Sequence, residues 1–135
     1  MALSNFSTDL SVVVVNGRQI RDFGDAATPY TDAPIDATSQ LRRGQGGSAI
    51  RLDRINPGRT VNLYVNPGSA DAAFLQGLYV SKANITLSFT QIGTLETAIG
   101  TEGVIVNDGQ RGRAGSTISD DQFIIEFNVW TASRG

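Results

Sequence analysis

The chain has 135 residues and a net charge of −2, and it contains no cysteine and no histidine. This composition excludes a disulfide framework, a zinc finger, a cysteine nucleophile and a Ser-His-Asp triad. The length fits one domain, which we expect to span residues 1–135. The negative net charge argues against binding nucleic acid through a broad basic face. Nearly all of the basic residues are arginine, the side chain that favours bidentate pairing at interfaces.

Residues 10–23 predict a β-hairpin. A β-branched run is followed by Asn16-Gly17, the strongest short-range hairpin signal, and a returning strand. With a two-residue loop, the more apolar face carries Val13, Val15 and Ile20. The other face still carries Val12 and Val14. These apolar side chains would be exposed in a monomer, so they indicate a face that a neighbouring subunit covers.

Residues 24–39 are expected to be irregular, with a short edge strand near Ile35. The basic segment 39–48 follows, and because it has no apolar anchor we expect a flexible loop. Its functional interpretation is contact with a partner, and the alternative is a solvated turn. A phosphate-binding loop is disfavoured because no Gly-Lys-Ser/Thr follows and the segment leads into a strand.

A second hairpin is predicted from residues 48–66. Its first strand, residues 48–55, places Ile50 and Leu52 on one face. Asn56-Pro57-Gly58 supplies the turn, because proline presets φ and glycine allows a positive φ. The strand 60–66 alternates, and its inward residues are Val61, Leu63 and Val65.

Ser69 is predicted to cap an α-helix over about residues 70–83. Its hydroxyl can accept a hydrogen bond from a free backbone amide, and Asp71 suits the positive end of the helix dipole. An apolar stripe of Phe74, Leu75, Leu78 and Tyr79 would face the strands.

Further strands are predicted over residues 85–92, 95–106 and 122–131, with a flexible basic loop at about 107–117. The last strand points Phe123, Ile125 and Phe127 to one face and places Trp130 on the other. The fold class is therefore mainly β: a β-sandwich or barrel of two packed antiparallel sheets with one flanking helix.

No catalytic set emerges from these elements. Asp120 and Asp121 are adjacent on a strand and point to opposite faces, so they do not form an acid–base pair. We expect no enzymatic activity, no metal and no cofactor. Exposed strand edges and surplus apolar faces instead favour a subunit of an assembly.

The sequence resembles a known family, the tail tube proteins of contractile-tailed bacteriophages. The resemblance lies in the order and spacing of segments across residues 16–130: Asn16-Gly17-Arg18-Gln19-Ile20-Arg21-Asp22-Phe23-Gly24-Asp25, Arg43-Gly44-Gln45-Gly46-Gly47-Ser48, Ile55-Asn56-Pro57, Val65-Asn66-Pro67-Gly68-Ser69-Ala70-Asp71 with Phe74-Leu75, and Asp120-Asp121-Gln122-Phe123-Ile124-Ile125-Glu126-Phe127. It implies hexameric rings that stack into a hollow tube inside a contractile sheath and conduct the genome during ejection.

The resemblance also implies partners and sites. The partners would be further copies of the chain, the tail sheath, the baseplate and the tail terminator, and DNA would pass through the lumen without specific binding. The loop 39–48 would bridge to the next ring. The expected contact residues between rings or subunits are Arg42, Arg43, Gln45, Arg51, Asp53, Arg54, Arg111 and Arg113. Carboxylates of a neighbour, such as Asp53, Asp120 or Asp121, would pair with Arg42 and Arg43. The expected lumen-facing residues are Thr86, Ser88, Thr90, Glu126 and Asn128, which would form a small, nearly neutral wall.

Two alternatives remain. The nearer one is the tube of a phage-derived injection particle, such as an R-type pyocin or a type VI secretion system. The other is a monomeric β-sandwich binding module, for example for carbohydrate, whose candidate exposed aromatics would be Tyr30, Tyr64 and Trp130. The first residues lack a secretion signal and no segment is long and apolar enough to span a membrane, so we expect assembly in the host cytoplasm and a final place in the virion tail.

Overall fold

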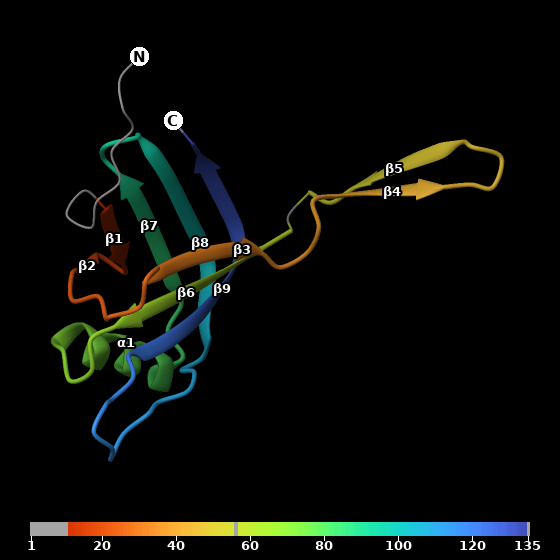
Figure 1. Ribbon diagram of the computed structural model, residues 1–135. Coiled ribbons are helices and arrows are strands. Elements are labelled where there is room, and N and C mark those ends of the chain that lie inside the picture. The colour runs from red at the N-terminus through yellow and green to blue at the C-terminus, as the bar shows by residue number, and fades with distance from the viewer. Residues whose placement is uncertain (1–10, 56, 135) are drawn as a thin grey trace.

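A computed structural model describes residues 11–55 and 57–134, so Leu10 and Asn56 of the predicted hairpins lie outside the described residues. The elements are, in order, β1 (Ser11–Val15), β2 (Arg18–Ile20), β3 (Tyr30–Pro34), β4 (Ser39–Arg43), β5 (Ala49–Asp53), β6 (Arg59–Val65), α1 (Ala70–Ser81), β7 (Ile85–Gln91), β8 (Glu96–Asn107) and β9 (Asp121–Ser133). One antiparallel sheet has the strand order β2-β1-β7-β8-β9-β6-β3, and β4 and β5 pair separately (Figure 1).

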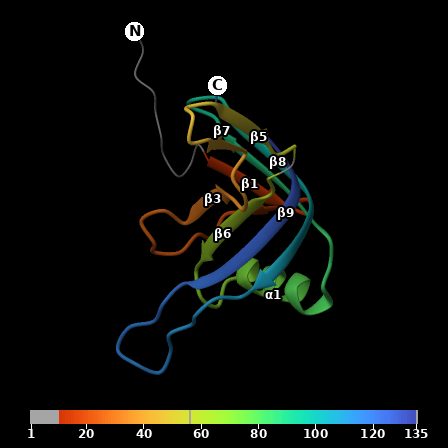
Figure 2. The same ribbon diagram turned by 90° about the vertical axis from the view of Figure 1, so that its right-hand side faces the viewer.

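The seven-stranded sheet curls until its two ends meet. Just after β2, Phe23 forms an isolated bridge with Val65 at the end of β6. The Gly24 amide donates to the Tyr64 carbonyl at 3.0 Å, and the Asn66 amide donates to the Asp22 carbonyl at 2.8 Å. The predicted fold class is confirmed: the chain is mainly β with one helix. The two packed layers are opposite halves of one curled sheet, and α1 lies at one end of it (Figure 2).

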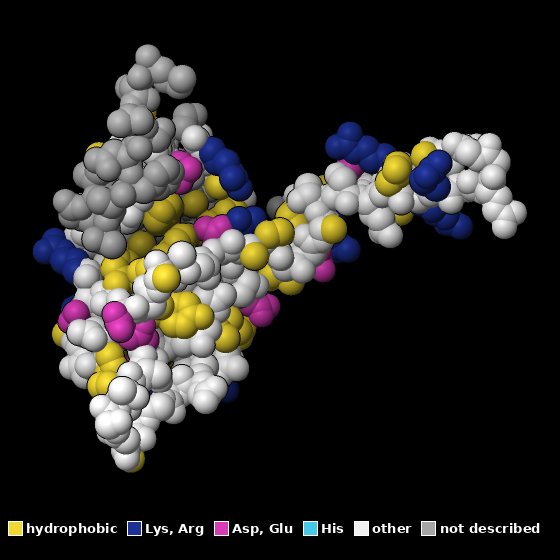
Figure 3. Space-filling view, in the orientation of Figure 1, with side chains coloured by type: hydrophobic (Ala, Val, Ile, Leu, Met, Phe, Trp, Pro, Cys, Tyr) yellow, Lys and Arg dark blue, Asp and Glu magenta, His cyan; other side chains and the backbone are white. Residues whose placement is uncertain are grey.

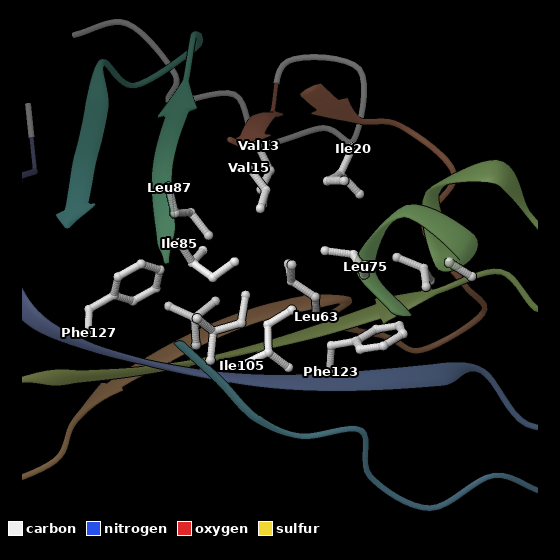
Figure 4. Packing of buried hydrophobic residues seen from close by; sticks show 14 residues of the cluster. Val13, Val15, Ile20, Leu63, Leu75, Ile85, Leu87, Ile105, Phe123 and Phe127 are labelled. Carbon is white, nitrogen blue, oxygen red and sulfur yellow. The ribbon is translucent and has the colours of Figure 1, made fainter. Parts of the chain in front are cut away.

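The core fills the space that the curled sheet encloses. Side chains from β1, β2 and β7 meet those from β6, β8 and β9, and Leu75 of α1 closes one side (Figure 4). The predicted inward faces are confirmed, because these residues are almost fully buried: Val13, Val15, Ile20, Val61, Leu63, Val65, Phe123, Ile125 and Phe127. Burial of apolar area on this scale is the main favourable term in folding.

The first hairpin and the helix form as predicted. Val13 pairs with Ile20 and Val15 with Arg18. The φ angles of Asn16 (49°) and Gly17 (86°) are both positive, as a two-residue hairpin turn requires. At the helix start, the Ser69 hydroxyl accepts a hydrogen bond from the Ala72 amide at 3.1 Å. Lys82, in the left-handed conformation, ends the helix.

The second predicted hairpin is wrong. β5 pairs with β4, whereas β6 lies between β9 and β3 in the large sheet. The segment 39–48, predicted as a loop, therefore contains strand β4 and a turn. The region 24–39, predicted as irregular with a short edge strand near Ile35, contains edge strand β3, which ends at Pro34. The alternation of apolar residues indicates a strand but does not select its partner, and Ile50 and Leu52 of β5 remain 59% and 49% exposed.

A sharp bend in β8 and β9 is the other departure from prediction. The register with β7 shifts between Ile85 and Leu87, and Glu102 has a positive φ of 53°. A Cβ on Gly100 would lie 2.8 Å from the Trp130 ring and 2.9 Å from the Phe127 ring. Trp130, predicted to face away from the core, instead packs against it, 5.6 Å from Phe127 between ring centroids.

Candidate functional site

A two-stranded arm, residues 39–53, projects away from the barrel (Figures 1 and 3). β4 and β5 pair along their length, and the Gly44 amide closes the tip with a 2.8 Å hydrogen bond to the Ser48 carbonyl. At its base the Arg54 amide donates to the Thr38 carbonyl at 2.7 Å. Five of the predicted contact residues lie on this arm: Arg42, Arg43, Gln45, Arg51 and Asp53. An isolated two-stranded hairpin is marginally stable in water, so the arm is a candidate for contact with a partner.

The arm exposes apolar side chains together with its arginines. Because paired residues share a face, Ile50 and Leu52 lie on the same face as Arg42, and Leu41 lies on the other. All residues of both strands are exposed, Leu41 by 63%. Sequence reasoning missed this apolar surface because it assigned Ile50 and Leu52 to a hairpin with β6.

The charges of the arm are only partly neutralised within the chain. The Arg51 Nε lies 2.8 Å from Asp53 Oδ1, which also accepts from the Ser39 hydroxyl at 2.8 Å. The side chains of Arg42 and Arg43 make no hydrogen bond or ion pair with any described residue. These two guanidinium groups are therefore available to an acidic partner.

The second basic segment lies at another end of the molecule. Arg113 donates to Asp121 at 2.6 Å, and Arg111 lies 3.8 Å from the same carboxylate. Asp120 accepts hydrogen bonds from the Asp25 and Ala26 amides at 3.0 and 2.9 Å. The predicted contact residues thus form two separate groups, since this loop and the arm extend from different parts of the barrel (Figure 1). The carboxylates expected to receive Arg42 and Arg43 already have partners in their own chain.

The predicted lumen residues also separate into two groups. Thr86, Ser88 and Thr90 form one row on β7, pointing away from the buried Ile85 and Leu87. Across the strand pairs, this row lies beside Val12 and Val14 of β1 and beside Ile99 of β8, which is 56% exposed. This face of β7 and its neighbours is therefore less uniformly polar than the predicted lumen wall.

Glu126 and Asn128 lie elsewhere, in a groove at the base of the arm. This arm-base groove has a volume of about 290 Å³ and is lined by Ile35, Asp36, Pro57, Gly58, Glu102, Glu126, Phe127 and Asn128. The Asn128 amide donates to the Glu102 carboxylate at 2.9 Å. Asp36 lies 3.7 Å from Arg54. Sequence reasoning did not find this groove, because the arm base and the bend of β8 and β9 meet only in the fold.

A buried carboxylate holds the closure of the barrel. Asp71 in the first turn of α1 accepts from the Arg21 and Asp22 amides, both at 2.9 Å, and from Arg18 Nε at 2.9 Å. Burial by itself raises the pKa of Asp71, but the hydrogen bonds from the Asp22 and Arg21 amides and from Arg18 outweigh it and leave the pKa below its usual value. Asp71 therefore ties the helix to the segment that joins β2 to β6.

The described part of the chain holds no cluster of three metal-binding side chains and no helix that could cross a membrane. No protein-family model matches the sequence, and the comparison with curated proteins finds no match.

Solved structures do share the fold. The tube-terminating cap of the anti-feeding prophage is similar with a TM-score of 0.57 at 15% identity, covering 100% of this chain and 95% of that one. A structure of the sheath/tube terminator of the PVC extracellular contractile injection system gives a TM-score of 0.58 at 14% identity, covering 98% and 99%. The chain has the fold seen in structures of contractile injection systems. The PVC sheath-tube complex gives a TM-score of 0.58 at 13% identity, covering 97% of this chain and 93% of that chain. The expected relation to tube proteins is thus confirmed at the level of the fold.

Proposed function

We propose that this protein is a structural subunit of the inner tube of a contractile tail, whose rings stack into a hollow conduit. The arm is the observation that carries the proposal. It exposes Leu41, Ile50 and Leu52 on a two-stranded hairpin that projects away from the described barrel. Such a surface needs a partner, and a neighbouring ring supplies one. The shared fold of tube and terminator structures supports the same conclusion.

The rings are proposed to be hexameric and the lumen to conduct a phage genome, as the resemblance of the sequence implies. In that arrangement the outer row of β7 lines the lumen. Thr86, Ser88 and Thr90 carry hydroxyl groups and no charge, so they would neither hold nor repel a passing polyanion strongly. Glu126 and Asn128, predicted for the same wall, line the arm-base groove, and we assign them to contact between subunits.

Negative-stain electron microscopy of the purified protein tests the proposal. We expect tubes or stacked rings from the wild type, and particles of monomer size would contradict it. The double variant Arg42→Glu, Arg43→Glu should lose stacking while its circular dichroism spectrum stays unchanged. The matched control is Lys82→Glu, Arg134→Glu, which changes the net charge equally at two exposed positions that have no ion-pair partner among the described residues.

The lumen assignment needs its own experiment. Thr86→Lys, Ser88→Lys places cations on the proposed wall, so it should impair DNA ejection more than tube assembly. The control is Ser116→Lys, Thr117→Lys, in an exposed loop away from β7. Normal infectivity of particles built from the Thr86 and Ser88 variant would remove the β7 row from the lumen.

A tube subunit of a phage-derived injection particle is an equally supported function, because the similar structures come from such particles. Sheath genes without capsid genes beside the coding gene would favour it. The monomeric binding module is disfavoured. Trp130 packs against the core, and the ring of Tyr30 stacks on Phe89 with 4.5 Å between centroids, so two of the three candidate aromatics do not form an open binding face.

A further inference from the structure

We infer that the arm-base groove is the receptor for the arm of a second copy of this chain, so that one polypeptide carries both halves of a head-to-tail contact. The inference rests on the proposed tube function and extends it by naming the receiving surface. The two halves match in chemistry: the arm is apolar and basic, and the groove is apolar and acidic.

The donor half is one face of the arm. Ile50 and Leu52 form an exposed apolar pair, and Arg42 stands beside them on the same face. Neither Arg42 nor its neighbour Arg43 has an anionic partner among the described residues. In Figure 3 dark blue and yellow side chains alternate along the arm. Guanidinium groups at an apolar edge suit bidentate pairing with carboxylates at an interface.

The acceptor half is the groove. Its apolar lining comes from Ile35, Pro57 and Phe127, and Ile35 is 45% exposed. Its carboxylates are Asp36, Glu102 and Glu126, of which Asp36 alone has a cationic partner within the described chain, Arg54 at 3.7 Å. A volume of about 290 Å³ lies just below the range of small-molecule sites, roughly 300–1,000 Å³, and is suited to one or two side chains.

The arm cannot reach the groove of its own chain. β4 alone carries Arg43 roughly 13 Å from Ser39 at about 3.3 Å per residue, and the arm points away from the barrel (Figure 1). The contact is therefore between copies and is heterologous, because donor and acceptor are different surfaces. Such a contact leaves a free arm at one end and a free groove at the other, so it propagates. This property is expected of a repeating tube subunit and not of a terminator, which needs only one half.

Complementary variants test the contact with full-length protein. The arm variant is Arg42→Glu, Arg43→Glu, and the groove variant is Glu102→Arg, Glu126→Arg. By analytical ultracentrifugation each alone should self-associate at least about tenfold more weakly than wild type. A one-to-one mixture should regain long assemblies in which the two variants alternate, since the acidic arm of the first variant meets the basic groove of the second, and the native arm of the second meets the native groove of the first. All four substitutions in one chain should restore long assemblies.

The outcomes separate the two proposals. If the wild type makes tubes and the groove variant makes them equally well, the groove is not the receptor but the tube function stands. If the wild type makes no tubes, the proposed tube function fails. The mixture of the arm and groove variants then still tests whether the groove receives the arm, and a mixture that does not associate overturns the inference. Unchanged circular dichroism spectra and melting temperatures show that the variants fold.

Cysteine cross-linking gives a second readout, because the native chain has no cysteine. In Arg42→Cys, Glu102→Cys, oxidation should give a ladder of multimers on a non-reducing gel, since each chain then carries one donor and one acceptor thiol. A disulfide needs Cα atoms within about 7 Å, which the arm excludes within one chain. The control Arg42→Cys, Thr117→Cys should give dimers at most. Tubes that form without a ladder would refute the docking.

Discussion

Removing the Asp71 carboxylate should loosen the closure of the barrel. In Asp71→Asn, the amide oxygen can still face the Arg21 and Asp22 amides, but the bonds lose their charge, and the amide nitrogen then faces Arg18. Hydrogen bonds to charged groups contribute about 1.5–3 kcal/mol each, and neutral ones about half as much. The Arg18 side chain is 43% exposed, so solvent screening reduces its share to a few tenths of a kcal/mol. We expect a loss of about 2 kcal/mol at pH 7.

Asp71→Ala should cost more, about 4 kcal/mol, because the part-buried hydrogen bonds of the Arg21 and Asp22 amides then have no acceptor. The measurement is urea denaturation at one fixed protein concentration, since assembly adds stability by mass action. Asp25→Asn is the matched control: its carboxylate is exposed and makes no hydrogen bond to a described residue, so the change should stay within about 0.5 kcal/mol.

The pH dependence of this stability difference tests whether the charge of Asp71 causes it. The folded pKa of Asp71 is lowered, so its contribution is complete above the unfolded pKa of about 3.9 and is lost as the pH falls through the folded pKa. The difference between wild type and Asp71→Asn should therefore shrink below about pH 4. Hydrogen exchange should also quicken at the Gly24 and Asn66 amides, which close the barrel. A stability difference that is independent of pH, or below about 0.5 kcal/mol at neutral pH, would refute the reasoning.

Three further changes test other parts of the fold. Gly103→Ala places a Cβ against the Phe127 ring and 3.1 Å from the Ile85 carbonyl, so it should cost about 1–3 kcal/mol in urea denaturation, and Phe127→Leu in the same chain should recover part of that loss. Ser69→Ala removes the helix cap and should cost about 1 kcal/mol by the same measurement. Burial and the nearby Asp32 raise the pKa of Tyr30, whose hydroxyl is buried. Its contribution to stability is therefore lost as the pH rises beyond the unfolded value of about 10, and Tyr30→Phe should keep its stability at neutral pH and lose less in alkali.

Local chemistry determined a large part of this fold from the sequence. Asn16-Gly17 selects the turn of the first hairpin, and the Ser69 hydroxyl starts the helix, because each acts on backbone groups only a few residues away. The alternation over residues 61–65 determined which side chains face the core. The absence of cysteine and histidine excluded whole classes of chemistry without reference to any contact.

Tertiary structure decided which strand pairs with which. The alternation in β5 fits pairing with β4 or with β6 equally well. A period of two shows which side chains of a strand share a face, but it does not show which strand is the hydrogen-bonding partner. The side chain of Trp130 lies on the core side for a related reason, because the bulge at Glu102 and the small size of Gly100 and Gly103 bend the sheet. The sequence pattern of β9 cannot predict this bend, since it is imposed by β8.

The candidate site likewise has one part that the sequence predicted and one part that only the fold revealed. The arginines of the arm were visible in the sequence because charge is a property of composition. The groove was not, because residues 35–36, 57–58, 102 and 126–128 become neighbours only when the curled sheet brings the arm base against the bend of β8 and β9. Sequence alone thus showed that this chain carries a basic segment suited to a partner. The fold alone showed that the segment is a hairpin with an apolar face, and that an acidic groove of matching chemistry lies on the same chain, because both properties depend on contacts between residues far apart in the sequence.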